Sequence, residues 1–321
     1  MGYGDYSLEA HKAITAAHAK RSVSDVFKAG ECHPSMNPLG VRYRESRDSA
    51  KHPNSVGIVF ALDVSGSMGE IPQQLATKTL PTFMSSVLTV LPDPQVCFIA
   101  FGNAYSDRSP LQVAQFESEA ALMDQWLSRI HLEGGGGTLG ESYDLAMYFA
   151  ARHMAMDCWQ KRQKKGYFFM TGDEVAFFSM LPSAVKSVVG DDIEKDPRMH
   201  ETIAELQKTF HVFFLIPDAK RAETDKCGQC WNDFLHERCI VLHSAEDTAV
   251  ACALLLGVQE GALKSRDDVA RQLETKMGRT GAERDRVIAA IGPFVDAIAS
   301  GKEIAPPEPN SLWEDAPARD G

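Results

Sequence analysis

Residues 56–68 read VGIVFALDVSGSM, an apolar run that passes directly into polar side chains. The part before Asp63 shows no alternation of apolar and polar residues, which is typical of a central parallel strand buried on both faces. Asp63, Ser65 and Ser67 then follow at alternate positions, and open α/β sheets bind ligands beyond the carboxyl ends of such strands. One carboxylate and two hydroxyls favour Mg²⁺, Mn²⁺ or Ca²⁺ over Zn²⁺. The alternative is a polar turn in which Ser65 or Ser67 caps the next helix.

Two later segments add oxygen side chains in similar positions. Residues 133–140 read EGGGGTLG, so Thr138 lies in a glycine-rich turn before the helical pattern of residues 142–149. Residues 167–174 read YFFMTGDE, so Asp173 follows another apolar strand. The glycines indicate either a flexible loop tip or a close approach of the backbone to a metal. Together the three segments resemble the metal-ion-dependent adhesion site of von Willebrand factor A domains.

This resemblance covers residues 55–258 and implies a set of metal ligands. In that family the two serines bind the metal directly, the threonine and the two aspartates bind directly or through water, and a partner protein's Glu or Asp completes the shell. The corresponding residues here are Asp63, Ser65, Ser67, Thr138 and Asp173. The family more often has Thr-Asp-Gly in the third loop, whereas this chain has Thr-Gly-Asp, so Glu174 stays open as an alternative.

Strands and helices alternate along the chain, which predicts an α/β fold with a parallel sheet covered on both faces. The resemblance makes this a doubly wound, Rossmann-like sheet with residues 111–116 as an antiparallel edge strand. Apolar residues at helical spacing predict helices over 75–91 and 116–130. The expected parallel strands are 56–62, 96–101, 167–170, 211–216 and 239–242.

Extensions flank the predicted domain on both sides. Residues 1–54 contain one amphipathic helix over 8–19, and we expect this extension to pack on the domain or on a partner. Residues 259–300 form a helical extension with helices over 263–273 and 282–299. Residues 301–321 are acidic and proline-rich, which predicts disorder, with Leu312-Trp313 as a candidate docking motif.

Composition narrows the class of protein. The 321 residues are 44% hydrophobic, enough for one large domain with additions, and include no apolar run long enough for a membrane helix. The start of the chain lacks a signal pattern, which predicts a cytoplasmic protein. A net charge of −11 argues against nucleic-acid binding. The basic residues 161–165 read as a solvated helix end that stops at Gly166, and the seven cysteines imply no disulfide framework.

Other chemistries have weaker support in the sequence. Cys227, Cys230, His236 and Cys239 could bind tetrahedral Zn²⁺. However, residues 231–238 read as a helix that leads into the strand from Cys239, which would carry the fourth ligand into the sheet, so a surface helix with incidental thiols is the favoured interpretation. A phosphatase of the haloacid-dehalogenase kind needs a second acidic residue where this chain has Ser65.

We therefore expect a non-enzymatic, Mg²⁺-dependent protein-binding module. The resemblance to intracellular bacterial members of the family implies an adaptor or scaffold that acts with a MoxR-type AAA+ ATPase or a multi-protein stress or defence system. One alternative is a metal-dependent hydrolase, for which His131 and Glu133 are the available bases. Another is a structural subunit that keeps the fold and uses no metal.

Overall fold

A six-stranded sheet forms the centre of the computed structural model, which describes residues 4–66, 68–134 and 140–310. Its strand order is β4-β3-β2-β6-β7-β8. β4 is antiparallel to β3, and the other neighbours are parallel. The strands span β2 (Ser55–Asp63), β3 (Asp93–Phe101), β4 (Leu111–Val113), β6 (Gly166–Thr171), β7 (Phe210–Ile216) and β8 (Cys239–Val241).

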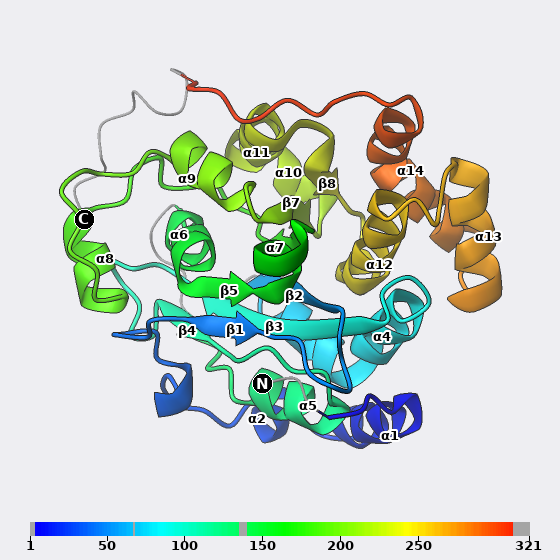
Figure 1. Cartoon of the computed structure of the whole chain (residues 1–321), viewed down its shortest axis with the longest axis horizontal. Helices are drawn as coiled ribbons and strands as arrows, with labels where there is room; N and C mark the ends of the chain where they lie inside the picture. The colour runs from blue at the N-terminus through cyan, green and yellow to red at the C-terminus, as the bar shows by residue number, and fades with distance from the viewer. Residues whose placement is uncertain (1–3, 67, 135–139, 311–321) are drawn as a thin grey trace.

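Helices cover both faces of this sheet (Figure 1), and contacts between aromatic rings identify the two layers. On one face, Phe60 meets Phe83 of α4 at 4.9 Å between ring centroids, and Phe213 meets Phe294 of α14 at 5.1 Å. On the other face, Phe214 stacks on Trp231 of α11 at 3.7 Å. The helices of the central part are α3 (Glu70–Gln74), a π-helical turn (Leu75–Thr79), α4 (Leu80–Val87), α5 (Ala120–Ser128), α6 (Tyr143–His153), α7 (Asp157–Arg162), α8 (Pro182–Val188), α9 (Met199–Leu206), α10 (Ala219–Glu223) and α11 (Cys227–Leu235).

This architecture confirms the predicted doubly wound α/β fold, including the antiparallel edge strand. The differences are local. The strand predicted over 111–116 ends at Val113, and the helix predicted over 116–130 spans only Ala120–Ser128. A second, two-stranded sheet, in which β1 (Arg44–Ser46) pairs with β5 (Met154–Met156), was not predicted. Three-residue strands are too short to show a period of two in the sequence.

The N-terminal extension packs on the domain. Its helix α1 (Leu8–His18) contacts α4 and α5, and His18 Nε2 lies 2.7 Å from Asp124 Oδ1. Farther along, Arg44 donates to the carbonyl oxygen of Val113 on the edge strand at 3.0 Å. The extension also includes a helical turn, α2 (Val23–Val26), and a 3₁₀ turn (Pro34–Met36). It therefore covers the free edge of β4, where unpaired backbone groups would otherwise be exposed.

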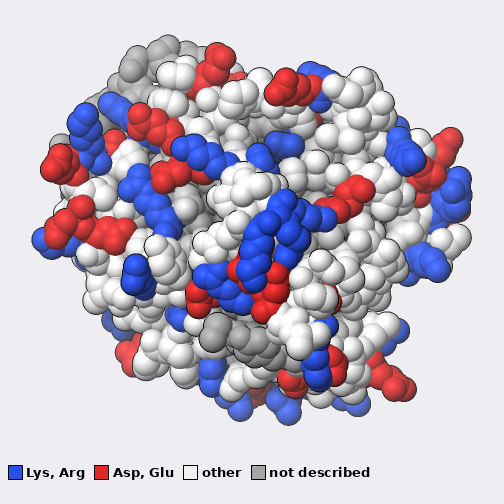
Figure 2. All heavy atoms as spheres, viewed as in Figure 1, with Lys and Arg blue, Asp and Glu red and all other residues white. Residues whose placement is uncertain are grey.

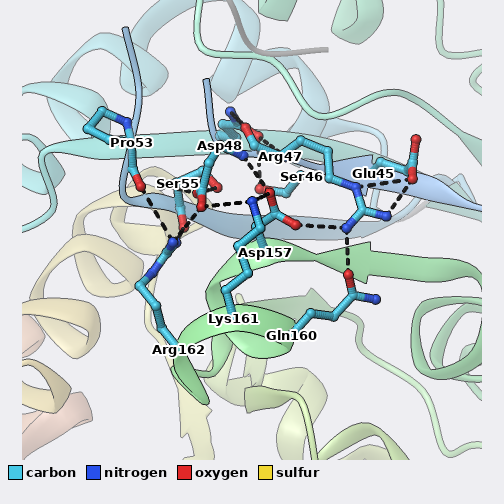
Figure 3. A network of polar contacts seen from close by, with 11 residues as sticks. Glu45, Ser46, Arg47, Asp48, Pro53, Ser55, Asp157, Gln160, Lys161 and Arg162 are labelled. Atoms are coloured by element: carbon cyan, nitrogen blue, oxygen red, sulfur yellow. Dashed lines mark hydrogen bonds and ion pairs between the residues drawn. The ribbon is translucent and has the colours of Figure 1, made fainter. Parts of the chain in front are cut away.

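A polar network fastens the end of this extension to α7 and β2 (Figure 3). Arg162 donates to Asp48 Oδ2 at 2.6 Å and to the carbonyl oxygen of Ser55 at 2.7 Å. Arg47 donates to Asp157 Oδ1 at 2.8 Å. Burial alone would raise the pKa of Asp48, but its hydrogen bonds with Arg162 and Ser55 lower it. The basic run at the end of α7 is thus partly a structural anchor and not simply solvated, and the helix stops at Gln163 (φ 54°), before the predicted Gly166.

Removing this anchor should loosen the extension. We expect Arg162→Ala to lower the free energy of unfolding by about 2 kcal/mol, because Asp48 and the Ser55 carbonyl lose their main donor. Urea denaturation measures the loss, and limited proteolysis should show faster cleavage between residues 44 and 54. The control is Lys186→Ala on α8, whose side chain is 65% exposed and pairs with the exposed Asp192, so its loss should be less than about 0.5 kcal/mol. Equal losses in both variants would contradict the assigned role of Arg162.

The C-terminal part adds helices on the α4 side. α12 (Thr248–Gln259) packs on α4 and α14 (Gly281–Ala299), which in turn packs on α13 (Arg266–Lys276). Residues 301–310 form no helix or strand and run past α11 (Figure 1), where Asn310 donates to Asp233 Oδ2 at 3.3 Å. The candidate docking motif Leu312-Trp313 lies outside the described residues.

The surface charges and the cysteines place few further limits on the kind of site that this protein has. Figure 2 shows basic and acidic side chains interspersed on one face, with a mixed group at its centre near α7. All seven cysteines are free thiols, and Cys97 and Cys252 are fully buried. Within the described ranges, no helix is long and apolar enough to cross a membrane.

Candidate metal site

The predicted site lies where the strand order reverses direction. β2 and β6 are neighbours at the centre of the sheet, and the chain continues outward from them in opposite directions. Open α/β sheets leave a crevice at such a switch point, outside the carboxyl ends of the strands. Asp63 is the last residue of β2, and Leu62 pairs with Thr171, the last residue of β6. Asp63 and the loop with Asp173 therefore emerge side by side at this crevice.

Asp63 is fully buried, and both of its carboxylate oxygens are held. Oδ1 accepts from the backbone N–H of Ser65 at 2.9 Å, and Oδ2 accepts from the hydroxyl of Tyr143 at 3.1 Å. Burial raises the pKa of Asp63 to about 7, assisted by the charge of Asp173 and opposed by polar groups of Ser65 and Tyr143. The carboxyl is fixed in orientation but lacks a compensating positive charge.

Ser65 is buried, and its hydroxyl has no hydrogen-bond partner of normal geometry among the described residues. The helix that follows, α3, begins after Gly69 and has no side-chain cap. Ser65 therefore does not cap α3, which was the alternative interpretation of this serine. A buried hydroxyl without a partner is costly and rare, and a bound cation would satisfy it.

Of the two acidic residues in the third loop, Asp173 is the one with a buried carboxylate oxygen that accepts no hydrogen bond from the described residues. Its side chain is 2% exposed, its Oδ1 has no partner, and its Oδ2 lies 3.4 Å from Arg221 Nε. Glu174 points to the second loop, where its Oε2 accepts from the backbone N–H of Gly140 at 2.7 Å. The geometry therefore favours Asp173 over Glu174 as a ligand.

The reversed order Thr-Gly-Asp in this loop has a steric reason. A Cβ atom on Gly172 would lie 2.3 to 2.6 Å from ring atoms and the hydroxyl of Tyr143. Tyr143 occupies this space while it donates to Asp63 and accepts from the backbone N–H of Glu174 at 3.3 Å. While Tyr143 occupies this space, glycine is needed at position 172, so an aspartate at that position is excluded. Sequence reasoning placed Tyr143 at the start of a helix and missed its part in the site.

Glu141 is a second residue that sequence reasoning missed. It is 3% exposed, its Oε2 has no hydrogen-bond partner, and its backbone forms a bridge to Ala176 that links the second and third loops. Burial, followed by the charges of Asp63 and Glu174, raises its pKa to about 9. Its position three residues after Thr138 gave no signal, because burial of a loop glutamate depends on the tertiary fold.

Two predicted ligands, Ser67 and Thr138, lie outside the described residues. Among the residues that are described, no three His, Cys, Asp or Glu side chains are grouped to hold a metal ion. Hydroxyls would have to complete the shell, as the adhesion-site pattern requires. The partnerless oxygens Ser65 Oγ and Asp173 Oδ1, with Asp63 between two fixed donors, fit a hard divalent cation. The full ligand set stays a prediction.

The competing sites are not assembled. Cys227, Cys230, His236 and Cys239 do not converge as a metal-binding group, since Cys227 Sγ instead donates to the Glu174 carbonyl oxygen at 3.3 Å. The expected helix is present as α11, followed by a 3₁₀ turn (His236–Arg238), but it begins at Cys227 and is not a surface helix at its thiols, because Cys227 and Cys230 are fully buried.

The candidate bases of the hydrolase alternative are engaged in structural contacts. His131 Nε2 lies 3.1 Å from Glu133 Oε2, and His131 Nδ1 lies 2.8 Å from the Ala29 carbonyl oxygen. Glu133 also accepts from the backbone N–H of Arg108 at 2.9 Å. These contacts fasten the N-terminal extension and neighbouring loops. The sequence favours a solvated loop end for this pair, but the two side chains are only 14% and 11% exposed.

A pocket of about 380 Å³ opens beside Asp173. Its lining comes from the start of α3, the end of β7 with α10, and the loop after β8: Met68, Glu70, Ile71, Asp173, Pro217, Asp218, Arg221, His243, Ser244 and Ala245. A ligand in this pocket would contact the third loop of the site directly.

Comparisons with known proteins add little to this geometry. The chain matches no known family model, and it matches no curated protein. It is similar to the pilus adhesin SpaC of Lactobacillus rhamnosus GG in its open conformation, at 14% identity over 71% of this chain and 31% of the adhesin, with a TM-score of 0.41. It is also similar to proximal thread matrix protein 1 of the mussel byssus, at 10% identity over 63% of this chain and 46% of that protein, with a TM-score of 0.35.

A further structure of the mussel protein, with a zinc-occupied adhesion motif, gives 9% identity, coverage of 63% of this chain and 47% of that one, and a TM-score of 0.37. The chain thus spans between about a third and a half of the length of these proteins. At such low identities and TM-scores, the description of the site depends on the strand order and contacts given above.

Proposed function

We propose that this chain is a divalent-metal-dependent protein-binding module without catalytic activity. The observation that carries the proposal is the pair of buried, partnerless oxygens, Ser65 Oγ and Asp173 Oδ1, next to the buried carboxyl of Asp63 at the switch point of the sheet. Buried polar atoms without partners are rare in folded proteins and call for an explanation such as a bound ion or water. Here two such atoms belong to the loops that follow β2 and β6, where the sequence predicts metal ligands.

The roles of the residues follow from their contacts. Ser65 N–H and the Tyr143 hydroxyl hold Asp63 in one orientation, so the chain supplies a rigid carboxylate. Ser65 and Asp173 would add one oxygen each, and Ser67 and Thr138 would complete the set by the family resemblance. A bound Mg²⁺ would present an open coordination position to a carboxylate. Because the hydroxyl ligands are neutral, the open position favours a Glu or Asp side chain of a partner protein.

We further propose, from the family resemblance alone, that the partner is an AAA+ ATPase of the MoxR type or a component of a multi-protein stress or defence system. Co-purification with such an ATPase, with and without Mg²⁺, tests this narrower proposal. Absence of such an ATPase from the Mg²⁺ sample would contradict this identity of the partner, whereas its recovery in EDTA as well would show that it binds without the metal site.

The experiment for the general proposal is an affinity pull-down from the source lysate in Mg²⁺ and in EDTA. We expect the wild-type chain to retain its partner only in Mg²⁺, and Ser65→Ala to retain less than about a tenth as much, since losing one ligand with its support costs metal affinity 10- to 100-fold. The matched control is Ser128→Ala on α5, whose hydroxyl donates within its own helix. Equal recovery under all conditions would show that the partner is bound without the metal site.

A further inference from the structure

Arg221 lies between the candidate metal site and the neighbouring pocket. Its Nε is 3.4 Å from Asp173 Oδ2, and its side chain is 46% exposed and lines the pocket. The other oxygen of Asp173 has no partner. One oxygen of this carboxylate is thus left for the expected metal, while the other lies beside a cation of the chain itself.

The segment that carries Arg221 is short and bounded by an unusual backbone. α10 (Ala219–Glu223) leads through a 3₁₀ turn (Thr224–Lys226) into α11. Asp225 and Lys226 have φ values of 48° and 61°, so two successive residues with side chains adopt the left-handed conformation. Each such residue is strained relative to the ordinary helical conformation, and the surrounding contacts must hold it there.

The two ends of this segment differ in how firmly they are attached. On the far side, α11 is tied to the third loop, because Trp231 Nε1 donates to the Glu174 carbonyl oxygen at 3.0 Å and the Cys227 thiol donates to the same oxygen. On the near side, the ion pair of Arg221 with Asp173 connects α10 to the same loop. The strained turn therefore lies between a fixed helix and an ion pair that depends on the charge of Asp173.

We propose that Arg221 is a latch that competes with the metal: it holds Asp173 when no metal is bound and releases it when the metal binds. A divalent cation on Oδ1 repels the guanidinium on Oδ2 and also draws charge away from that ion pair. Release of Arg221 frees residues 219–226 to relax and widens the pocket beside the metal for the partner's residues. Metal binding and ligand access are coupled in this way, and the coupling must act in both directions.

This inference rests on the proposed function, because it requires a metal at Asp173. It identifies Arg221 as a residue that sets metal affinity without being a ligand. It also explains why a basic side chain lies beside a carboxylate that the sequence assigns to a cation.

The test is isothermal titration of Mg²⁺ into the metal-free wild type, Arg221→Gln and the control Lys220→Gln. Lys220 precedes Arg221 on α10 and carries the same charge, so the control removes an equal charge next to the latch. We expect Arg221→Gln to bind Mg²⁺ at least fivefold more tightly and Lys220→Gln to bind like the wild type. Hydrogen exchange over residues 219–226 should be faster in metal-free Arg221→Gln, and equally fast in the wild type with Mg²⁺.

The outcomes separate the latch from the proposed function. If the wild type binds no Mg²⁺, the metal site and the latch both fail. If the wild type and Arg221→Gln bind Mg²⁺ with equal affinity, or Lys220→Gln gains as much as Arg221→Gln, the metal site stands and the latch is wrong. Exchange over 219–226 that is unchanged by both Mg²⁺ and Arg221→Gln would also overturn it.

Discussion

Mg²⁺ at about 100 times its dissociation constant is expected to raise the free energy of unfolding of the wild-type chain by about 3 kcal/mol, as for any ligand that binds only the folded state. The physical reason is local. Ser65 Oγ and Asp173 Oδ1 are buried without partners, and the pKa of Asp63 is raised to about 7 by burial. A cation would satisfy the two oxygens and compensate the buried charge.

The variant that tests this is Asp63→Asn. An amide keeps the acceptor for the Ser65 N–H, and the Tyr143 hydroxyl can accept from the amide nitrogen, so the fold should survive. We expect this variant to be at least as stable as the wild type without metal and to gain nothing from Mg²⁺. Urea denaturation at pH 8, with Mg²⁺ or EDTA, measures both quantities.

The control for the Mg²⁺ effect is Asp157→Asn, which removes a buried carboxylate of the α7 network far along the chain from the site. It should lose stability because the amide keeps only one of the two oxygens that accept from Arg47 and the Asp48 backbone and carries no charge to pair with Lys161, yet it should keep the full Mg²⁺ increment. An equal Mg²⁺ increment in Asp63→Asn would show that the stabilising ion binds elsewhere.

Asp144→Asn is expected to stabilise the protein by up to about 4 kcal/mol at pH 8. Asp144 lies in the first turn of α6, is 3% exposed, and has its pKa raised from 3.8 to about 7 by burial, against the opposing hydrogen bond from the Leu145 N–H. Each pKa unit corresponds to about 1.4 kcal/mol. The positive end of the helix dipole favours the charged form, so the estimate is an upper one.

The sign follows from proton binding. Because the folded-state pKa lies above the unfolded value, the folded chain holds a proton that the unfolded chain has lost between about pH 4 and pH 7. This contribution is fully present below the unfolded value and is lost as the pH rises. The stability difference between Asp144→Asn and the wild type should therefore grow by about 3 kcal/mol from pH 4.5 to pH 8, as measured by urea denaturation.

Asp157 provides the opposite case as a control. Hydrogen bonds from Lys161, the Asp48 backbone and Arg47 outweigh burial and lower its pKa, so its contribution is present above the unfolded value and is lost on acidification. Asp157→Asn should therefore be most destabilising at neutral pH. A difference between Asp144→Asn and the wild type that does not change with pH would show that Asp144 is not a buried neutral carboxyl.

Much of the fold follows from local pattern. The uninterrupted apolar run before Asp63 predicts β2, and similar runs predict β3, β6 and β7 within one to three residues of their observed ends. Strands that are buried on both faces must consist mainly of apolar residues, whatever their position in the sheet, and this composition is visible in the sequence. The short strands β1 and β5 escape prediction because three residues pair only when tertiary contacts bring them together.

The sequence by itself determined the sheet type and the oxygen-rich loops at the carboxyl ends of its strands, because strand burial and ligand chemistry depend on residue type and spacing. Tertiary structure decided how those loops are used. It brought the Tyr143 hydroxyl to Asp63 and turned Glu174 toward Gly140. It left Asp173 Oδ1 without a hydrogen-bond partner and placed Arg221 beside Asp173 Oδ2. It also buried Glu141. The contacts among these join residues 34 to 80 positions apart, and no local pattern encodes which of them form.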